Sequence, residues 1–172
     1  MMAAYAAAES GHAVTLLEQN EKLGKKLFIT GKGRCNLTNA SDMEQLFANV
    51  VSNRKFLYSA FYSYDNEQVI SFFESHGMPT KTERGNRVFP VSDHSSDVIA
   101  ALSAALREQH VEVFLHTKVK RLLLEKRDEE KRVTGVELAD HTKMHADAVI
   151  VATGGISYPS TGATGDGYRM AE

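Results

Sequence analysis

The chain has 172 residues, 42% hydrophobic and 24% charged, a composition that excludes a disordered or fibrous protein. With 20 Lys and Arg against 22 Asp and Glu, its formal charge of −2 favours neither a nucleic-acid nor an anionic-membrane partner. The single cysteine, Cys35, excludes an intrachain disulfide framework and a four-cysteine zinc cluster, and it favours a cytoplasmic protein.

A helix and a buried strand are the first predicted elements. Met1–Ser10 is rich in alanine and Gly11 ends it, and the apolar run Ala13–Leu17 then stops at Glu18. Helix, tight turn and buried strand form the second half of a βαβ unit. A G-x-G-x-x-G loop normally lies roughly 20 residues ahead of such an acid, so we expect it, with the first strand, to precede Met1.

A basic loop and a small insertion come next. Residues 19–41 are basic and glycine-rich with little periodicity, which predicts an irregular loop. The insertion at 42–90 is predicted to hold three helices and a hairpin: Met43–Val51, Lys55–Tyr62, a helix with a capping box of Asp65 and Gln68, and Thr80–Pro90.

Residues 91–172 are predicted to form the α/β core together with residues 1–41. An amphipathic helix runs from a cap at Ser95 or Ser96 to Gln109. A turn is expected at Glu125–Arg132, and Asp166 is expected to cap a final helix. The strands are predicted at Val111–Leu115, Val119–Leu124, Val133–Leu138, Thr142–His145 and Ala148–Ala152.

Glu18 occupies the position at which dinucleotide-binding folds place an acid. Its carboxylate would accept hydrogen bonds from the adenosine ribose hydroxyls. A solvated glutamate at a strand end is the alternative. At the far end of the chain, the apolar run ends in Thr153-Gly154-Gly155, where glycines let the backbone approach a cofactor closely.

The loop Gly24–Asn39 does not have the spacing of a Walker phosphate loop. Six residues separate Gly24 from Gly31, and Gly33 rather than Ser or Thr follows Lys32. A flexible loop with fixed cations and amide donors suits a pyrophosphate, a ribityl chain or an anionic flavin ring. A basic solvated loop is the alternative.

Two segments together resemble a known family. GKKLFITGKGRCNLTN (24–39) and ATGGISYPSTGATGDGY (152–168) are similar to the signature of the BaiN-like, or aminoacetone-oxidase-like, flavoproteins, a bacterial family of NAD(P)/FAD-dependent oxidoreductases. The resemblance covers the whole chain. It implies an incomplete Rossmann-like FAD-binding domain of the two-dinucleotide-binding-domain type, α/β in class, with an antiparallel β-meander over Val119–His145.

The resemblance also implies site residues and ligands. FAD would be the cofactor, with NAD(P)H as a co-substrate and a small molecule as the substrate. Glu18 would hold the adenosine ribose and Val119 would contact adenine through its backbone. The flavin side of FAD would be lined by Lys26, Gly33, Arg34 and Asn36. The edge of the cofactor would be lined by Thr153, Gly154 and Gly155, and the flavin would be approached by Tyr158, Thr161 and Gly162.

The chain departs from the family pattern in two ways. The leading strand and its glycine loop are absent, and the family continues past Glu172 into a substrate-covering insertion and a returning segment. We therefore expect the missing N- and C-terminal segments of the same protein to be partners of this chain. Without them it should bind FAD weakly or not at all.

The leading hypothesis is an FAD-dependent oxidoreductase, an NAD(P)H-linked reductase or dehydrogenase of a small organic substrate, for which no catalytic residue can be named. The alternatives are an oxygen-using, FAD-dependent amine oxidase and a non-catalytic nucleotide- or RNA-binding module. Cys35 is expected to pack or to line the cofactor, because no second cysteine completes a disulfide-exchange cycle. The seven histidines show no ligand spacing, so no metal site is expected.

Overall fold

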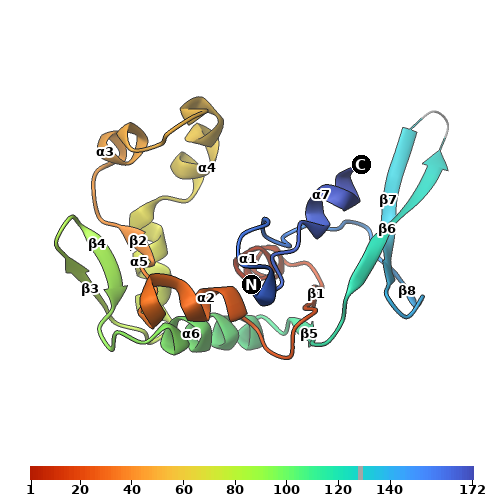
Figure 1. The fold of residues 1–172 in the computed structure, drawn as a ribbon, viewed down its shortest axis with the longest axis horizontal. Helices are drawn as coiled ribbons and strands as arrows, with labels where there is room; N and C mark the ends of the chain where they lie inside the picture. Colours follow the sequence, from red (N-terminus) through yellow and green to blue (C-terminus); the bar gives the residue numbers. More distant parts are fainter. Residues whose placement is uncertain (128–129) are drawn as a thin grey trace. The chain divides into compact units, whose positions relative to one another are not determined.

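The structure is a computed structural model that describes residues 1–127 and 130–172, with elements labelled as in Figure 1. The chain divides into two compact units. Unit 1 comprises Met1–Lys26 and Leu106–Glu172, and unit 2 comprises Leu27–Ala105. These bounds differ from those of the expected insertion at 42–90, which stays a prediction.

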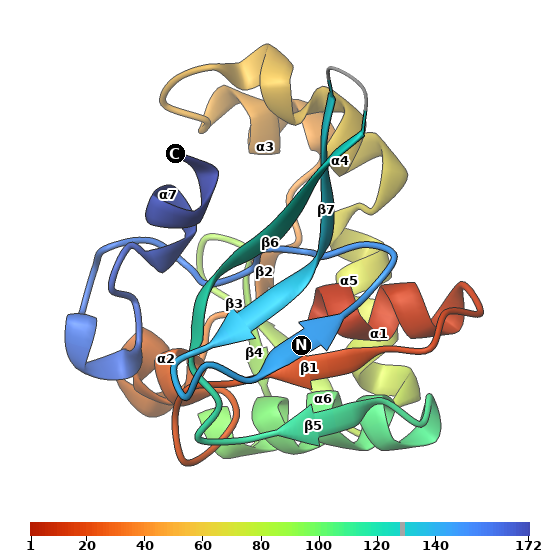
Figure 2. The same ribbon diagram turned by 90° about the vertical axis from the view of Figure 1, so that its right-hand side faces the viewer.

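Unit 1 contains the predicted helix, turn and strand. Helix α1 (Met2–Glu9) ends at a turn that includes Gly11, which has φ +88°, and strand β1 (Thr15–Leu17) follows. In Figure 2, β1 lies beside β5 (Glu112–Phe114), with which it pairs in parallel. The core beneath them consists of Ala4, Ala8, Leu106 and Val111. The small alanines allow the helix to pack closely, and the pairing is that of a βαβ-type sheet.

An antiparallel sheet forms the second part of unit 1. Strands β6 (Val119–Arg127), β7 (Glu130–Leu138) and β8 (Lys143–His145) are neighbours in that order. The predicted three-stranded meander is therefore confirmed. Its first two strands extend further than predicted into the expected turn at 125–132, whose remaining residues, 128–129, lie outside the described part of the chain.

The expected buried strand at Ala148–Ala152 is wrong. The segment is irregular, and Ile150 and Val151 are 63% and 43% exposed. A strand requires a hydrogen-bonded neighbour. Within residues 1–127 and 130–172, β1 and β5 pair with each other and no strand pairs with 148–152. The apolar composition of the segment indicated that it could be buried. It did not indicate which element would pair with it.

Unit 1 ends in the short helices η3 (Pro159–Thr161) and α7 (Asp166–Ala171). The prediction that Asp166 caps the last helix is wrong, because Gly165 occupies the cap and Asp166 is the first helical residue. Its buried carboxylate instead accepts the Thr164 hydroxyl at 2.6 Å and pairs with Arg169. Bonds to Thr164, two residues before it, and Arg169, three residues after it, therefore replace the capping role.

Unit 2 begins where an irregular loop was expected, and short elements are present instead. They are α2 (Lys25–Ile29), whose first two residues belong to unit 1, η1 (Thr30–Gly33) and β2 (Thr38–Asn39). Elements this short leave no periodic pattern in a sequence. Strand β2 joins the predicted hairpin of β3 (Thr80–Glu83) and β4 (Arg87–Pro90), in the order β2-β4-β3.

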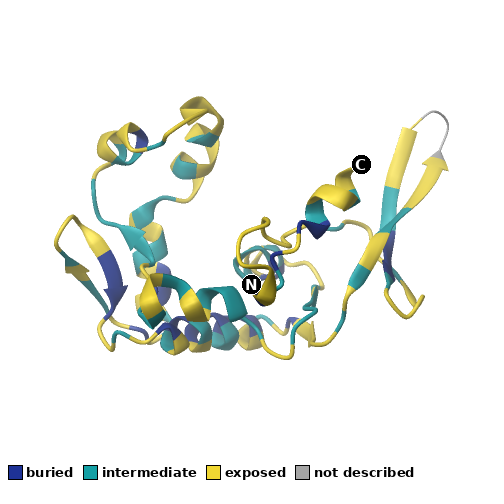
Figure 3. Cartoon of the chain, viewed as in Figure 1, coloured by how far each residue is buried: buried dark blue, intermediate teal, exposed yellow. Residues whose placement is uncertain are grey.

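The helices of unit 2 lie where the sequence predicts them, but the expected cap at Ser95 or Ser96 is wrong, because the helix already includes both residues. Helix α5 (Asn66–Ser75) has the predicted capping box of Asp65 and Gln68. The long helix α6 (Ser95–Glu108), whose last turn belongs to unit 1, carries a buried stripe that is dark blue in Figure 3. The other helices are α3 (Met43–Ala48), η2 (Arg54–Leu57) and α4 (Tyr58–Ser63). Within the described ranges, no helix has the length and apolar character needed to cross a membrane.

Candidate functional site

The carboxylate of Glu18 is held in one orientation at the carboxyl end of β1. Its Oε1 accepts hydrogen bonds from the Asn20 backbone N at 2.8 Å and from Asn20 Nδ2 at 2.7 Å. Glu18 is half-buried, and its Oε2 accepts no hydrogen bond from the described residues. This oxygen retains its acceptor capacity, which suits it to a ligand hydroxyl.

Two carboxamides that follow Glu18 hold a loop from the far end of the chain. Gln19 Nε2 donates to the Gly162 carbonyl at 2.9 Å, and Asn20 Nδ2 donates to the Thr161 carbonyl at 3.2 Å. The Thr161 hydroxyl in turn donates to the Tyr158 carbonyl at 2.7 Å. The structure therefore brings the predicted residues Glu18, Thr161 and Gly162 together within unit 1.

Gly162 is required by both its backbone and its surroundings. Its φ is +93°, and a Cβ there would lie 2.8 Å from Asn20 Nδ2 and 3.0 Å from Gln19 Nε2. A larger residue would be strained and would displace the two amides. The glycine therefore permits the close contact between this loop and the end of β1.

Lys26 contacts the same loop. Its ammonium donates to the Ser157 carbonyl at 2.7 Å and lies 4.7 Å from the centre of the Tyr158 ring. Cation–π contact of this kind fixes both groups. Tyr158 as a whole is 66% exposed, which leaves its side chain available to a ligand.

The Thr153-Gly154-Gly155 segment packs against the start of α7. The Gly155 carbonyl accepts from Gly165 N at 3.2 Å, and a Cβ on Gly167 would lie 2.7 Å from Thr153 Oγ1. Gly154 and Gly155 have no atom within 4 Å of the position of a Cβ. They therefore leave open space beside the backbone, as close approach of a cofactor requires.

Val119 begins β6, close in the chain to residues that contact the end of β1. Thr117 N donates to the Glu18 carbonyl at 2.8 Å, and His116 N donates to the Asn20 carbonyl at 3.0 Å. Val119 itself pairs with Leu138 of β7. The predicted adenine-contacting residue thus follows directly on a segment that is fixed to Glu18.

The other predicted residues lie in unit 2, where Arg34 belongs to a charge network. Its guanidinium donates to Asp93 and Glu83, and it stacks on Phe89 with 4.3 Å between Cζ and the ring centre. Lys81 Nζ contacts Asp93 Oδ2 at 2.7 Å. Two cations and two carboxylates therefore neutralise each other, and the Arg34 charge is already matched within the chain.

The ionisation of these groups reflects the network. The hydrogen bond from Arg34 is the main cause that lowers the pKa of Glu83, and those from Lys81 and then Arg34 lower the pKa of Asp93. Bonds to Glu83 and then Asp93 raise the pKa of Arg34. All of these charges are retained at neutral pH.

Asn36 directly follows the buried Cys35, and Gly33 lies two residues before it. Asn36 Nδ2 donates to the Thr38 and Val88 carbonyls at 2.8 and 3.0 Å, so its amide fixes strands β2 and β4. Gly33 has φ +86° and open space at its Cβ position. Cys35 is only 3% exposed, which suits packing rather than reaction with a soluble thiol reagent.

Gln19 and Asn20 were missed by sequence reasoning. Their only signal was their position, immediately after an acid at a strand end, where side-chain amides readily bond local backbone groups. Their partners are 143 and 141 residues away along the chain, which no local pattern reveals.

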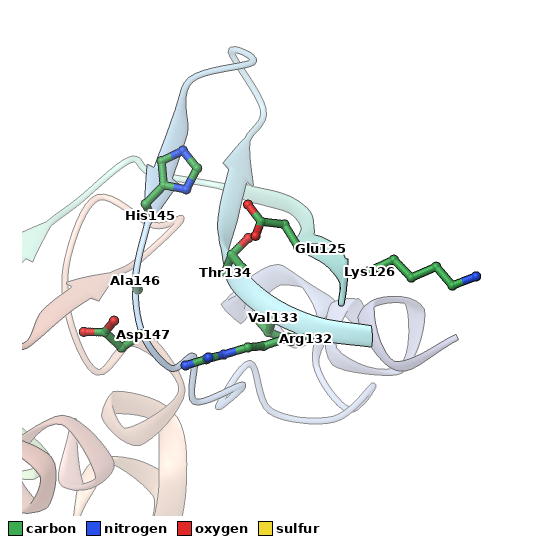
Figure 4. A pocket seen from close by; sticks show the side chains of 8 residues that line it. All are labelled: Glu125, Lys126, Arg132, Val133, Thr134, His145, Ala146 and Asp147. Atoms are coloured by element: carbon green, nitrogen blue, oxygen red, sulfur yellow. The ribbon is translucent and has the colours of Figure 1, made fainter. Parts of the chain in front are cut away.

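A depression of about 640 Å³ on the antiparallel sheet is not part of this site. Figure 4 shows its lining side chains, among which Lys126 points away from His145 and Asp147. None of the predicted site residues lines it. It is formed by Glu125, Lys126, Arg132, Val133, Thr134, His145, Ala146 and Asp147. Among the residues that the structure describes, no cluster of three or more His, Cys, Asp or Glu could hold a metal ion.

Comparison with known proteins identifies relatives along the whole chain. Residues 1–172 match the family model described as the HI0933-like protein Rossmann domain. A 3-dehydro-bile acid delta(4,6)-reductase of Clostridium scindens is 36% identical over 99% of this chain. A ribosomal RNA dihydrouridine synthase of Haemophilus influenzae is 29% identical over 96% of it. The chain spans about 40% of the length of each of these relatives.

A solved structure supports the fold. The crystal structure of THI4 from Thermovibrio ammonificans aligns with a TM-score of 0.60 at 16% identity, over 93% of this chain and 55% of that one. With the family match, this likeness confirms the Rossmann-like α/β class and the family resemblance predicted from the sequence.

Proposed function

Because the chain belongs to the HI0933-like Rossmann-domain family, we propose that it forms much of the FAD-binding portion of a flavin-dependent oxidoreductase. One observation carries the proposal: the Glu18 carboxylate is fixed through Oε1 at the end of β1 while Oε2 stays open. In dinucleotide-binding folds this is where an acid accepts the ribose hydroxyls.

The residues around Glu18 fit an adenosine and pyrophosphate chain. Glu18 would accept the ribose hydroxyls, and the backbone at Val119 would face adenine. Gly154 and Gly155 have the open Cβ space that a close cofactor needs, and Thr153 would line the same edge. When bound, the flavin would supply the hydride and electron transfer. The protein's part is to bind it, orient it and limit access of water.

Lys26, Tyr158, Thr161 and Gly162 would form the flavin-side wall in unit 1. Lys26 holds Ser157 and Tyr158 in place, and the exposed Tyr158 side chain can contact a ligand. In unit 2, Arg34 and Asn36 would act indirectly, since their side chains already bond Asp93, Glu83 and strand carbonyls. Through these bonds they would fix the conformation of the loop that contains Gly33.

The proposed reaction is reduction of an organic substrate with electrons from NAD(P)H. Support comes from the relatives' names: a delta(4,6)-reductase acts on carbon–carbon double bonds, and dihydrouridine differs from uridine by two hydrogens across one such bond. A double bond conjugated to a carbonyl is the shared substrate class. If the reduced flavin were reoxidised only by oxygen and an amine were consumed, the amine-oxidase alternative would be favoured instead.

A second candidate is reduction of a base within RNA. The dihydrouridine synthase relatives support it, whereas the formal charge of −2 does not supply a basic surface. Titration of a short RNA at 50 and 200 mM salt, against a protein that also includes the expected N- and C-terminal segments, separates the two candidates. RNA binding through phosphates should weaken steeply with salt, by roughly tenfold or more, whereas FAD binding should change little.

We further propose that segments of the same protein outside residues 1–172 complete the cofactor site. The support is the exposure of the apolar side chains Ile150 and Val151, together with the pairing of β1 with β5 alone among the described strands. A parallel strand followed by a glycine-rich loop would satisfy both. The test is to express the longer reading frame and reconstitute it with FAD. A yellow protein is expected, and a colourless one with no flavin absorbance would contradict the proposed function.

A further inference from the structure

Asn20 bonds two acceptors with one amide nitrogen. Its Nδ2 lies 2.7 Å from Glu18 Oε1 and 3.2 Å from the Thr161 carbonyl. A primary amide has two N–H donors at a fixed angle, and both are used here. The side chain therefore connects the carboxylate at the end of β1 to a loop 141 residues further along the chain.

The backbone of Asn20 fixes the bridge in place. Its N–H donates to the same Glu18 Oε1 at 2.8 Å, and its carbonyl accepts from His116 N at 3.0 Å. Oε1 thus receives two hydrogen bonds from one residue. These two bonds restrict rotation of the carboxylate. They therefore also fix the direction in which Oε2 points.

The loop at the other end of the bridge needs external support. Tyr158 and Gly162 both have left-handed backbone conformations, with φ of +57° and +93°. Local backbone hydrogen bonds form the turn between them: Thr161 N donates to Tyr158 O, and Gly162 N donates to Pro159 O, each at 3.0 Å. Such a turn is strained at the non-glycine residue and persists only when its surroundings hold it.

From this geometry we propose that Asn20 is a positioning residue that couples the Glu18 carboxylate to the loop Tyr158–Gly162. The proposal rests on the proposed function, since it takes a ribose as the partner of Glu18 Oε2. Orientation of the carboxylate and order of the loop would then depend on each other. By linkage, a ribose bound at Glu18 would also stabilise the loop that faces the flavin.

Gln19 provides a control within the same segment. Its amide donates to the Gly162 carbonyl at 2.9 Å but makes no hydrogen bond to Glu18. Gln19→Ala should therefore loosen the loop and leave the carboxylate oriented. Asn20→Ala should loosen the loop and also release the carboxylate from the side-chain amide, and Asn20→Asp keeps the shape while removing the two side-chain donors. Circular dichroism of each variant checks that the chain is folded.

The first measurement is hydrogen exchange of the amides of Thr161, Gly162 and Thr164, which are bonded within the loop. Loss of one anchoring hydrogen bond should accelerate exchange by roughly tenfold in Asn20→Ala, Asn20→Asp and Gln19→Ala. Exchange in Glu18→Gln should stay near the wild-type rate, because its side-chain oxygen still accepts from Asn20. Unchanged exchange in both Asn20 variants would overturn the anchoring of the loop.

The second measurement compares binding of ADP and 2′,3′-dideoxy-ADP. In the longer protein that includes the segments outside 1–172, wild type and Gln19→Ala should prefer ADP by roughly tenfold, since hydroxyls bonded to a carboxylate are worth that much. Asn20→Ala should lose most of this preference. Equal preference in Asn20→Ala and Gln19→Ala would overturn the positioning role. A longer wild-type protein that binds neither nucleotide would contradict the proposed nucleotide site, and hydrogen exchange alone would then decide whether Asn20 anchors the loop.

Discussion

Arg34 donates two hydrogen bonds to a single oxygen of Asp93, from Nε at 2.8 Å and from Nη2 at 2.5 Å. The same Nη2 also reaches Glu83 Oε1 at 2.5 Å. The guanidinium therefore joins the loop before β2 to the hairpin of β3 and β4 and to the turn that precedes α6. This arginine stabilises unit 2, whatever it contributes to a cofactor.

The first prediction concerns coupling within this network. Arg34→Met and Asp93→Asn should each destabilise the chain modestly, because the two side chains are 35% and 40% exposed and solvent screens their attraction. The double variant should lose less than the sum of the two, since the interaction can be removed only once. Urea unfolding of the four proteins measures this. Strictly additive losses would show that the ion pair contributes nothing.

The second prediction concerns Glu137 in the antiparallel sheet. Its buried carboxylate binds Arg121 and Lys120 and contacts His141, and the Arg121 hydrogen bond is the main cause that lowers its pKa to about 2. A lowered pKa in the folded state means that the stabilisation is complete above the unfolded value of about 4.3. It is lost as the pH falls from there towards about 2.

The test compares unfolding free energies at pH 6 and pH 3. The wild-type chain should lose more stability on acidification than Glu137→Gln, which has no carboxylate to protonate. Glu112→Gln is a matched control at an exposed position, and it should follow the wild-type curve. If Glu137→Gln and wild type lose equal stability, the network does not hold the sheet together.

The third prediction concerns the glycines of the candidate site. Gly162→Ala should destabilise the chain by about 2–3 kcal/mol, since left-handed backbone and displacement of neighbours both oppose it. Gly154→Ala has a similar φ, +74°, but open space around its Cβ. It should lose only the backbone contribution of about 1 kcal/mol. Equal losses in urea unfolding would show that the Asn20 and Gln19 amides do not obstruct a Cβ at position 162.

The fourth prediction concerns Cys35. A thiol that is 3% exposed should react with a maleimide only when unit 2 opens. Labelling in the native state should therefore be slower than in urea by roughly two orders of magnitude or more. Native labelling as fast as that of the unfolded chain would show that the thiol is accessible and would reopen a redox role.

Elements with complete local signals could be predicted from the sequence. The capping box of α5 forms as its residues dictate, with Gln68 N donating to Asp65 Oδ1 at 2.8 Å and Asp65 N to Gln68 Oε1 at 2.9 Å. Helix α1 and the hairpin of β3 and β4 were predicted for the same reason. Each is specified by residues that are close together in the chain.

Relationships between distant residues could not be predicted. No pattern near Asn20 indicates the Thr161 carbonyl, and no pattern near Arg34 indicates Asp93, 59 residues away. The 148–152 segment shows the converse, because its composition favours a strand but strand formation depends on a neighbour. Glu18 was selected because dinucleotide-binding folds place an acid at this strand end, whereas the bond that ties its partner Asn20 to Thr161 could not be predicted.

The most direct test of the central claim is a titration of FAD into the longer protein, wild type and Glu18→Gln. Replacement of the carboxylate with an amide keeps the bond from Asn20 but weakens acceptance of the ribose hydroxyls. We expect wild type to bind FAD and Glu18→Gln to bind it roughly tenfold more weakly, with unchanged folding. Equal affinities of the two proteins, or no binding by either, would contradict the proposed role of Glu18 in cofactor binding.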